Sequence, residues 1–169
     1  MLVDKLLERV PNLWLSRSWN TRPKRPGERD DAYTFVDPET FLAHARAGGF
    51  LEWVEFLPGD YRGTPVPDPP PDHDVVLEID IRGARQVRER YPDAIVIMVL
   101  PPSRAAQEER LRRRGDSEEL IRARLELAET EEAEGRELAD HVIVNDDLNR
   151  AVEELAGIVE MHRSRTGES

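Results

Sequence analysis

An α/β fold, with a parallel sheet covered by helices, is predicted from the second half of the chain. Three apolar runs, VVLEIDI at 75–81, AIVIMVL at 94–100 and HVIV at 141–144, alternate with segments of helical periodicity. Nearly continuous apolar strands are typical of parallel sheets buried on both faces, and a β-α-β-α order favours that arrangement. With 169 residues, the chain has the length of a single domain.

The first half alternates helices and strands less regularly. Residues 2–9 have helical periodicity, 13–18 read as a strand, and 20–29 form a basic loop rich in Pro and Arg. A strand at 34–36 leads into a helix that starts at Asp37-Pro38 and stops at Gly48-Gly49. A strand follows at 50–56, and 57–74, with its prolines, is predicted to be irregular.

Four helices follow in the second half. They are expected at 83–90, from PPS to about Arg114, from about Ser117 to Leu138, and in a last amphipathic segment that begins at Leu148.

Composition excludes several function classes. The 24 Lys and Arg residues face 35 Asp and Glu residues, and this net charge of −11 argues against broad nucleic-acid binding. The absence of Cys excludes disulfides and thiolate chemistry, and the four His residues have no ligand spacing, so no protein metal site is expected. Neither a membrane span nor a secretory signal is visible, which favours a cytoplasmic location.

Two groups of arginines are candidate phosphate ligands. Arg22 and Arg25 lie in the stiff basic loop, and a guanidinium matches phosphate bidentately; a solvated basic turn is equally compatible. Arg110 and Arg114 share a helix face four residues apart, before Gly115, where a solvated face is the simpler interpretation.

Carboxylates on predicted strands are the second kind of candidate. Glu78 and Asp80 lie two residues apart, so on a strand both would point to one side. A carboxylate on a buried strand needs a cation, a metal ion or another donor. Glu52, within FLEWVEF, raises the same question, and it could accept two N–H donors from a guanine edge.

These segments together resemble the guanylate kinase family. The resemblance rests on SRSWNTRPKRPGE, AYTFVDPETF, FLEWVEF, GDYRGTP, VVLEIDIRGARQV, LPPS, RRRG and VIVNDDL, in this order, and it covers residues 2 to about 160. It implies a nucleoside monophosphate kinase that moves the γ-phosphoryl group of ATP, with Mg²⁺, to GMP, in purine nucleotide metabolism. It also implies a single domain with a three-layer, P-loop kinase-like core (1–18 and 74–169), an inserted GMP-binding subdomain (19–73) and a short lid (about 110–124).

The resemblance assigns roles to single residues. The implied contacts to the phosphate of GMP are Ser18, Arg22, Arg25 and Tyr33. The implied guanine readers are Glu52 and Thr64, helped by Glu78 and Asp80. The implied catalytic arginines are Arg110, Arg114 and Arg124, with Arg110 also on ATP and Asn145 beside the adenine.

Two departures from the family pattern lie within the matched region. Arg62 stands where the family usually has Tyr, so one hydroxyl for the phosphate of GMP is replaced by a guanidinium. The prolines at 65–71 stand in place of a helix that the family usually has.

The larger departure concerns the ATP side. The sequence holds no GxxxxGK[ST] loop, whose amides and Lys cradle the ATP phosphates, and its two lysines, Lys5 and Lys24, lie elsewhere. The family's first strand, central in its sheet, is also expected to be missing between strands 75–81 and 94–100. An exposed slot there would favour oligomers through strand addition.

Three accounts remain open. The chain is a guanylate kinase with a shortened N-terminus and weak activity, a GMP-binding pseudokinase, or an interaction domain that binds phosphorylated peptides. The retained Ser18, Glu52 and lid arginines argue against the third account, because a peptide binder has no need of guanine readers.

Overall fold

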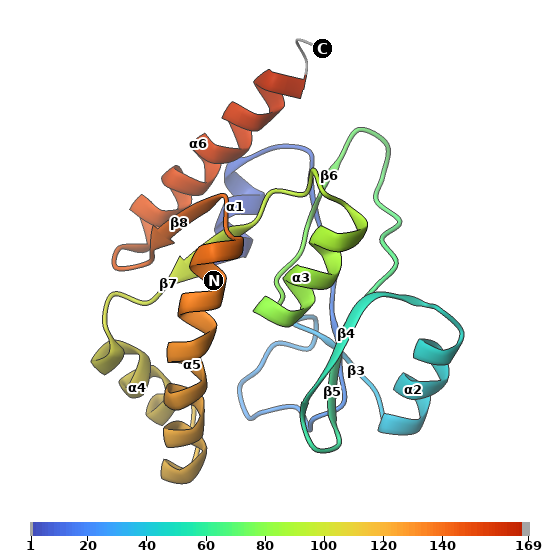
Figure 1. Ribbon diagram of the computed structural model, residues 1–169, viewed down its shortest axis with the longest axis vertical. Coiled ribbons are helices and arrows are strands. Elements are labelled where there is room, and N and C mark those ends of the chain that lie inside the picture. The colour runs from blue at the N-terminus through green and yellow to red at the C-terminus, as the bar shows by residue number, and fades with distance from the viewer. Residues whose placement is uncertain (1, 167–169) are drawn as a thin grey trace. The chain divides into compact units, whose positions relative to one another are not determined.

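The computed structural model describes residues 2–166, which form two compact units (Figure 1). The central unit runs from Pro11 to Ala94, and the terminal unit joins the residues up to Val10 to those from Ile95 onward. Both units combine helices with parallel strand pairs, which confirms the α/β class. The finer division into core, GMP-binding subdomain and lid stays a prediction.

A four-stranded sheet, in the order β3-β2-β5-β4, is the larger sheet of the central unit. The strands β4 (Phe50–Leu57) and β5 (Asp60–Pro65) form an antiparallel hairpin. The strand β2 (Trp19–Asn20) pairs antiparallel with β5, and β3 (Thr34–Phe35) pairs in parallel with β2.

The prediction of an irregular segment at 57–74 was wrong for β5. Gly59 makes the hairpin turn at φ +79°, a conformation that glycine adopts without a steric penalty. Pro65 is the last residue of the strand, where a missing N–H does least harm to the sheet. The proline-rich composition therefore described the residues after Pro65 and hid the strand before it.

Helix α2 (Pro38–Arg46) begins as predicted and packs against the hairpin. The side chain of Asp37 accepts a hydrogen bond from the backbone N–H of Thr40 at 2.9 Å, which satisfies one donor of the first turn. Phe41, fully buried, stacks on Phe50 with 4.4 Å between ring centroids. This cluster forms the core beneath the sheet and holds β4 in place.

The second sheet of the central unit is the parallel pair β1 (Leu13–Leu15) and β6 (Asp74–Val76). The strand predicted over 75–81 is therefore too long: it ends at Val76, and helix α3 (Ile81–Arg90) begins at residue 81 rather than 83. The physical reason is Asp80, whose carboxylate accepts from the N–H of Gly83 at 2.9 Å as the N-cap of α3.

The terminal unit contains four helices and one strand pair among its described residues. Its parallel strands are β7 (Ile97–Leu100) and β8 (His141–Val144). Helix α5 (Glu118–Leu138) packs against β7, and α6 (Leu148–Thr166) packs against both β8 and α1 (Leu2–Arg9) (Figure 1). The short α4 (Arg104–Arg113) pairs with α5. The predicted helices of this unit are confirmed.

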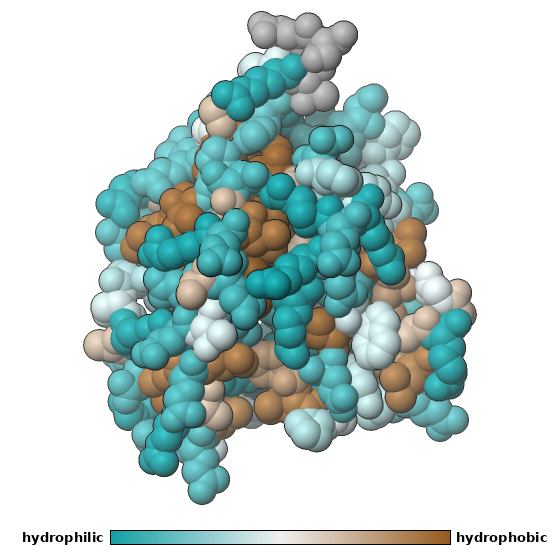
Figure 2. All heavy atoms as spheres, in the orientation of Figure 1, coloured by the Kyte–Doolittle hydropathy of each residue, from teal (hydrophilic) through white to brown (hydrophobic). Residues whose placement is uncertain are grey.

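The predicted burial of these strands on both faces was wrong. Val99 is 42% exposed and Val142 is 40% exposed, whereas Leu100 and Ile143 are buried. Within the described residues, β7 pairs with β8 alone and β6 with β1 alone, so each of these strands has one open edge. Figure 2 shows one face of the molecule, where hydrophilic residues predominate and several apolar patches lie between them.

No helix in residues 2–166 is both long enough and apolar enough to span a bilayer.

Candidate active site

The central unit brings the predicted guanine readers together. Glu52 on β4 lies opposite Thr64 on β5 in the strand register, and both residues are buried. The hydroxyl of Ser18 lies 3.4 Å from that of Thr64. The three side chains therefore form one polar group, which we call the Glu52 cluster.

Helix α3 closes the Glu52 cluster from the other side. Gln86 accepts from the backbone N–H of Trp53 and donates to its carbonyl oxygen at 2.9 Å, which ties α3 to β4. Gly83 lies so close to Glu52 that a Cβ at this position would stand 2.5 Å from Glu52 Oε2. The glycine therefore leaves room for the carboxylate, and a larger residue would displace it.

The carboxylate of Glu52 has no cation beside it among the described residues, unlike most buried acids. Burial raises the pKa of Glu52, hydrogen bonding from Thr64 opposes this rise, and the negative charge of Asp80 adds to it. A buried carboxylate without a cation is unfavourable unless N–H or O–H donors reach it. Thr64 supplies such donors from its side chain and its backbone, and the carboxylate has further lone pairs for a ligand that brings donors of its own.

A second cluster, the Arg22 cluster, carries the predicted phosphate contacts. Arg22 donates from Nη2 to Glu28 Oε1 at 2.5 Å and from Nη1 to Glu28 Oε2 at 2.8 Å. Its guanidinium carbon lies 5.5 Å from the ring centre of Tyr33 and 5.4 Å from that of Phe35. Arg25 joins the cluster through its backbone N–H, which donates to Glu28 Oε2 at 3.0 Å.

Electrostatics show that further charged groups are near Tyr33. Burial raises the pKa of its hydroxyl, the charge of Glu78 adds to the rise, and Arg22 and Arg62 oppose it. Arg62, the departure from the family pattern, pairs with Asp60 at 3.2 Å and lies over the ring of Phe56. The positive charge of Arg62 therefore lowers the pKa of Tyr33, and the carboxylate of Asp60 partly neutralises that charge.

The premise behind Glu78 and Asp80 needs correction. Neither lies on a strand: β6 ends at Val76, Glu78 is exposed, and Asp80 caps α3 and pairs with Arg82 at 3.2 Å. The argument from two carboxylates on one face of a buried strand was therefore wrong. Their charges still act on the site, Asp80 on Glu52 and Glu78 on Tyr33.

The terminal unit carries the predicted catalytic arginines. Arg114, at the C-cap of α4, donates to Asp116, and Arg124 on α5 lies 3.5 Å from the same carboxylate. The side chain of Asp116 is 4% exposed, so this acid joins the end of α4 to α5 from a buried position. Arg110 is exposed, and the described residues include no hydrogen-bond or ion-pair partner for its side chain.

Asn145 lies directly after β8, and its backbone N–H donates to the carbonyl of Leu100 at 2.8 Å. Its backbone therefore extends the β7–β8 pairing.

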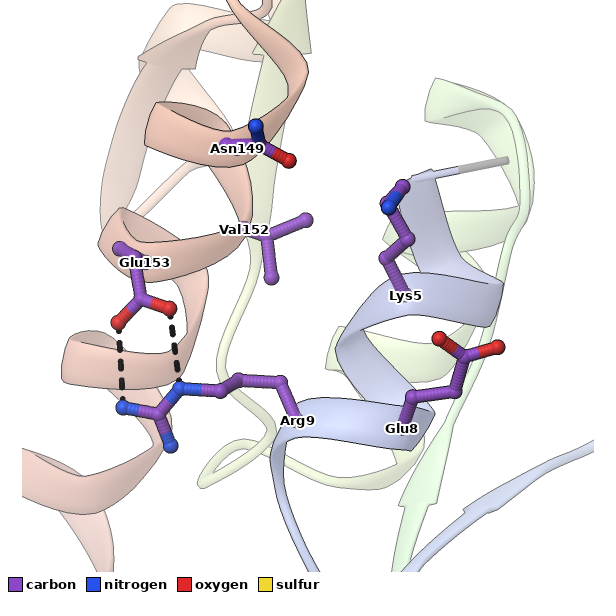
Figure 3. Close-up of a pocket in the computed structure, with 6 residues that line it drawn as sticks. All are labelled: Lys5, Glu8, Arg9, Asn149, Val152 and Glu153. Atoms are coloured by element: carbon purple, nitrogen blue, oxygen red, sulfur yellow. Dashed lines mark hydrogen bonds and ion pairs between the residues drawn. The ribbon is translucent and has the colours of Figure 1, made fainter.

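Lys5 lies in a surface pocket between α1 and α6 (Figure 3). The opposite wall of this pocket includes Glu153, which binds Arg9 through two hydrogen bonds of 3.0 and 3.1 Å. Within the described residues, no three His, Cys, Asp or Glu side chains come together as a metal site.

Sequence reasoning missed three residues that shape these clusters. Glu28 stands in the quoted motif SRSWNTRPKRPGE, but no role was assigned to it. Asp116 follows Gly115 in the chain, where its only signal was a charge next to a break. Gly83 carries a steric role that no spacing rule reveals, because its neighbour Glu52 is 31 residues away in sequence.

Comparison with known proteins identifies the family of the chain. The family model described as guanylate kinase matches residues 1–162. The guanylate kinase of Xylella fastidiosa is 45% identical over 170 residues, which cover 97% of this chain and 82% of that protein. That of Symbiobacterium thermophilum is 46% identical over 167 residues, covering 95% of this chain and 78% of that protein.

The fold of the chain is also similar to that of a solved guanylate kinase structure. The crystal structure of guanylate kinase from Anaplasma phagocytophilum superposes with a TM-score of 0.75 at 32% identity, over 95% of this chain and 79% of that one. The chain belongs to the guanylate kinase family, a family of nucleoside monophosphate kinases.

Proposed function

We propose that the chain binds GMP in its central unit and transfers to it the γ-phosphoryl group of MgATP, forming GDP and ADP. The observation that carries the proposal is the buried carboxylate of Glu52, which has no cationic partner among the described residues. Guanine presents N1–H and N2–H₂ donors along one edge, whereas adenine presents an acceptor at N1. A carboxylate in this position therefore accepts from guanine and repels adenine.

The other residues fall into two roles around that carboxylate. Thr64 reads the guanine together with Glu52, and the charge of Asp80 acts on the same carboxylate. Ser18, whose hydroxyl lies 3.4 Å from that of Thr64, contributes to the phosphate contacts. Arg22, Arg25 and Tyr33 receive the phosphate of GMP in the Arg22 cluster, within the field of Glu78. A guanidinium between a carboxylate and aromatic rings is held in place before the ligand arrives, which lowers the entropic cost of binding.

In this proposal, residues of the terminal unit bind ATP, the phosphoryl donor. Arg114 and Arg124, paired with Asp116, and the exposed Arg110 supply positive charge for the phosphates of ATP, and Asn145 lies beside the adenine. Mg²⁺ enters as part of the donor substrate MgATP, held mainly by phosphate oxygens and water, as this ion commonly is in phosphoryl-transfer sites.

The absence of a GxxxxGK[ST] motif from these 169 residues decides how fast the reaction can be. Phosphoryl transfer depends on positioning and charge stabilisation, and losing one preorganised donor can cost about 10²–10³-fold in rate. We therefore expect the 169-residue chain to form GDP more slowly, by orders of magnitude, than a version extended by a strand and GxxxxGK[ST].

A coupled assay of GDP and ADP formation with both purified chains tests this proposal. Rapid GDP formation by the short chain would contradict the expectation that transfer is slow without GxxxxGK[ST]. GMP binding without GDP formation by either chain would favour a GMP-binding protein without kinase activity. Binding of a phosphopeptide in preference to GMP would favour an interaction domain.

The open edges of β6 and β7 support one further proposal, which is self-association by strand addition. Light scattering of the short and extended chains tests it. We expect the short chain to associate and the extended chain to stay monomeric, and a monomeric short chain would contradict the proposal.

A further inference from the structure

The carboxylate of Glu28 occupies only one of the two binding edges of Arg22. A guanidinium has an end edge, formed by one N–H of each Nη, and a side edge, formed by Nε–H and the second N–H of Nη2. Glu28 takes the end edge at 2.5 and 2.8 Å, and the carbonyl of Pro23 takes the second Nη1–H at 3.0 Å. No hydrogen bond among the described residues uses the Nε–H of Arg22.

Other arginines of this chain show what the side edge accepts. Arg9 binds Glu153 through Nε and Nη2, and Arg29 binds Asp31 through the same two atoms at 2.8 and 2.7 Å. Both of those pairs are exposed, whereas the side chains of Arg22 and Glu28 are 12% and 15% exposed. Arg22 is therefore held at its end edge in a partly enclosed place. Its side edge, the one through which Arg9 and Arg29 bind carboxylates, is still available.

Local backbone geometry explains how Glu28 reaches this position. The N–H of Glu28 donates to the carbonyl of Arg25 at 3.1 Å and closes a turn over Pro26 and Gly27. Gly27 has a φ of +76°, and proline followed by a residue of positive φ is the combination that a type II turn requires. The turn brings Glu28 back toward Arg22 and places Glu28 Oε2 3.0 Å from the amide nitrogen of Arg25.

We infer that Glu28 is a positioning residue for the GMP phosphate: it holds the guanidinium of Arg22 so that the Nε and Nη2 edge faces the incoming oxyanion. The rings of Tyr33 and Phe35, each about 5.5 Å from the guanidinium carbon, restrict its remaining rotation. The inference rests on the proposed binding of GMP in the central unit. It is opposed to a simple alternative, in which Glu28 competes with phosphate for Arg22 and leaves when GMP binds.

The two readings predict opposite effects of Glu28→Gln. If Glu28 positions Arg22, the variant binds GMP more weakly by about tenfold or more, the scale of one charge-assisted hydrogen bond, and its affinity for guanosine stays within about twofold. Glu28→Asp retains the charge and should recover part of the loss. If Glu28 competes with phosphate, Glu28→Gln binds GMP more tightly.

Asp31→Asn is the matched control, because Asp31 is an exposed carboxylate in the same loop that pairs with Arg29 and Arg17. It should change neither affinity. Thermal unfolding of each variant separates a damaged fold from a displaced arginine, because a damaged fold lowers guanosine and GMP binding together. Equal loss for both ligands, no loss, or a gain for GMP alone would each overturn the inference.

A measurement without GMP separates the failure of this inference from failure of the proposed function. Nitrogen-15 NMR of the arginine side chains in the free chain should show slow rotation of the Nη groups of Arg22, because two hydrogen bonds hold its end edge. Glu28→Gln should make that rotation fast. Fast rotation in the unaltered chain would overturn the inference even if GMP binds, whereas slow rotation without GMP binding would count against the proposed function alone.

Discussion

The two clusters of the central unit each contain a largely buried glutamate, but the two glutamates are in opposite electrostatic situations. Glu28 binds Arg22 at both oxygens, and this pairing lowers its pKa from an ordinary 4.5 to about 2. Glu52 is more deeply buried, lacks a cation within the described residues, and has its pKa raised by burial. One carboxylate is paired with a guanidinium, whereas the other is held by hydrogen bonds from Thr64 and has no cation among the described residues.

This difference assigns a task to each end of the site. A satisfied ion pair has little to gain from a ligand, so we propose that the Glu28 end holds an arginine in place for a phosphate. A buried carboxylate without a cation is stabilised when further donors arrive, so we propose that the Glu52 end selects a base with N–H groups on its edge. Phosphate affinity and base selectivity should therefore respond to different substitutions.

The largest difference between the loss of GMP affinity and the loss of guanosine affinity is expected for Arg22→Ala. Charge-assisted contacts to phosphate are worth about 1.5–3 kcal/mol, so affinity for GMP should fall by roughly 10- to 150-fold. Affinity for guanosine, which has no phosphate, should change little, and Arg25→Ala should behave in the same way. Isothermal titration with both ligands measures this, and Arg29→Ala, an exposed arginine of the same loop, is the control. Equal losses for nucleotide and nucleoside would show that the arginines only shape the loop.

Glu52→Gln should act on the base and leave the phosphate contacts intact. The amide offers one acceptor where guanine presents two donors, so the preference for GMP over AMP should shrink by about 1–3 kcal/mol. The free chain should be at least as stable as before, because a buried charge is removed. Titration and thermal unfolding of the variant check both effects, and an undiminished preference for GMP would show that Glu52 does not read the base.

The opposite pKa shifts predict opposite pH dependences. The pKa of Glu28 is lowered, so its stabilising contribution is present above about pH 4.5 and disappears as the pH falls toward 2. The pKa of Glu52 is raised, so its contribution is present at low pH and disappears as the pH rises through that pKa.

Guanosine binding should report the Glu52 shift directly. Affinity should decrease as the pH falls through the pKa of Glu52, because a protonated carboxyl no longer accepts two hydrogen bonds. Guanosine is the suitable ligand because the phosphate of GMP titrates near pH 6. Titrations between pH 4 and 8 measure the effect, which should be absent in Glu52→Gln. A slope that persists in this variant would assign it to another group.

The smallest effect is expected for Gly83→Ala. The added methyl would stand 2.5 Å from Glu52 Oε2, so the carboxylate must shift and selectivity for guanine should drop several-fold. The gain in helix propensity, about 1 kcal/mol at most, opposes any loss of stability. Gly157→Ala is a matched control in α6, where nothing lies within 4 Å of the new methyl, and it should leave binding unchanged. Unchanged selectivity in Gly83→Ala would mean that the carboxylate moves freely.

Local signals predicted much of the fold. The capping residues Asp37 and Ser117, each with its side chain on the N–H three residues later, mark helix starts that the structure confirms. The end of β6 was misplaced because Ile79 and Ile81 continue the apolar run beyond Val76, whereas the side chain of Asp80 between them caps α3. The strand β5 was missed because its hairpin turn lies in a proline-rich segment.

The site was less accessible to sequence reasoning than the fold. Resemblance to the family selected Ser18, Glu52 and Thr64, and the structure brings them together. It did not reveal what makes each glutamate different. The pairing of Glu28 depends on the geometry of one turn, and the enclosure of Glu52 depends on Gly83 from a distant helix, and neither relation follows from spacing along the chain.

The central claim is that Glu52, buried and without a cation among the described residues, makes the central unit selective for guanine. Calorimetric titration of the 169-residue chain with GMP and with AMP, under identical conditions, tests it most directly. GMP should bind at least about tenfold more tightly than AMP, because AMP would leave a buried polar group without a hydrogen-bond partner. AMP binding as tightly as GMP would contradict the claim.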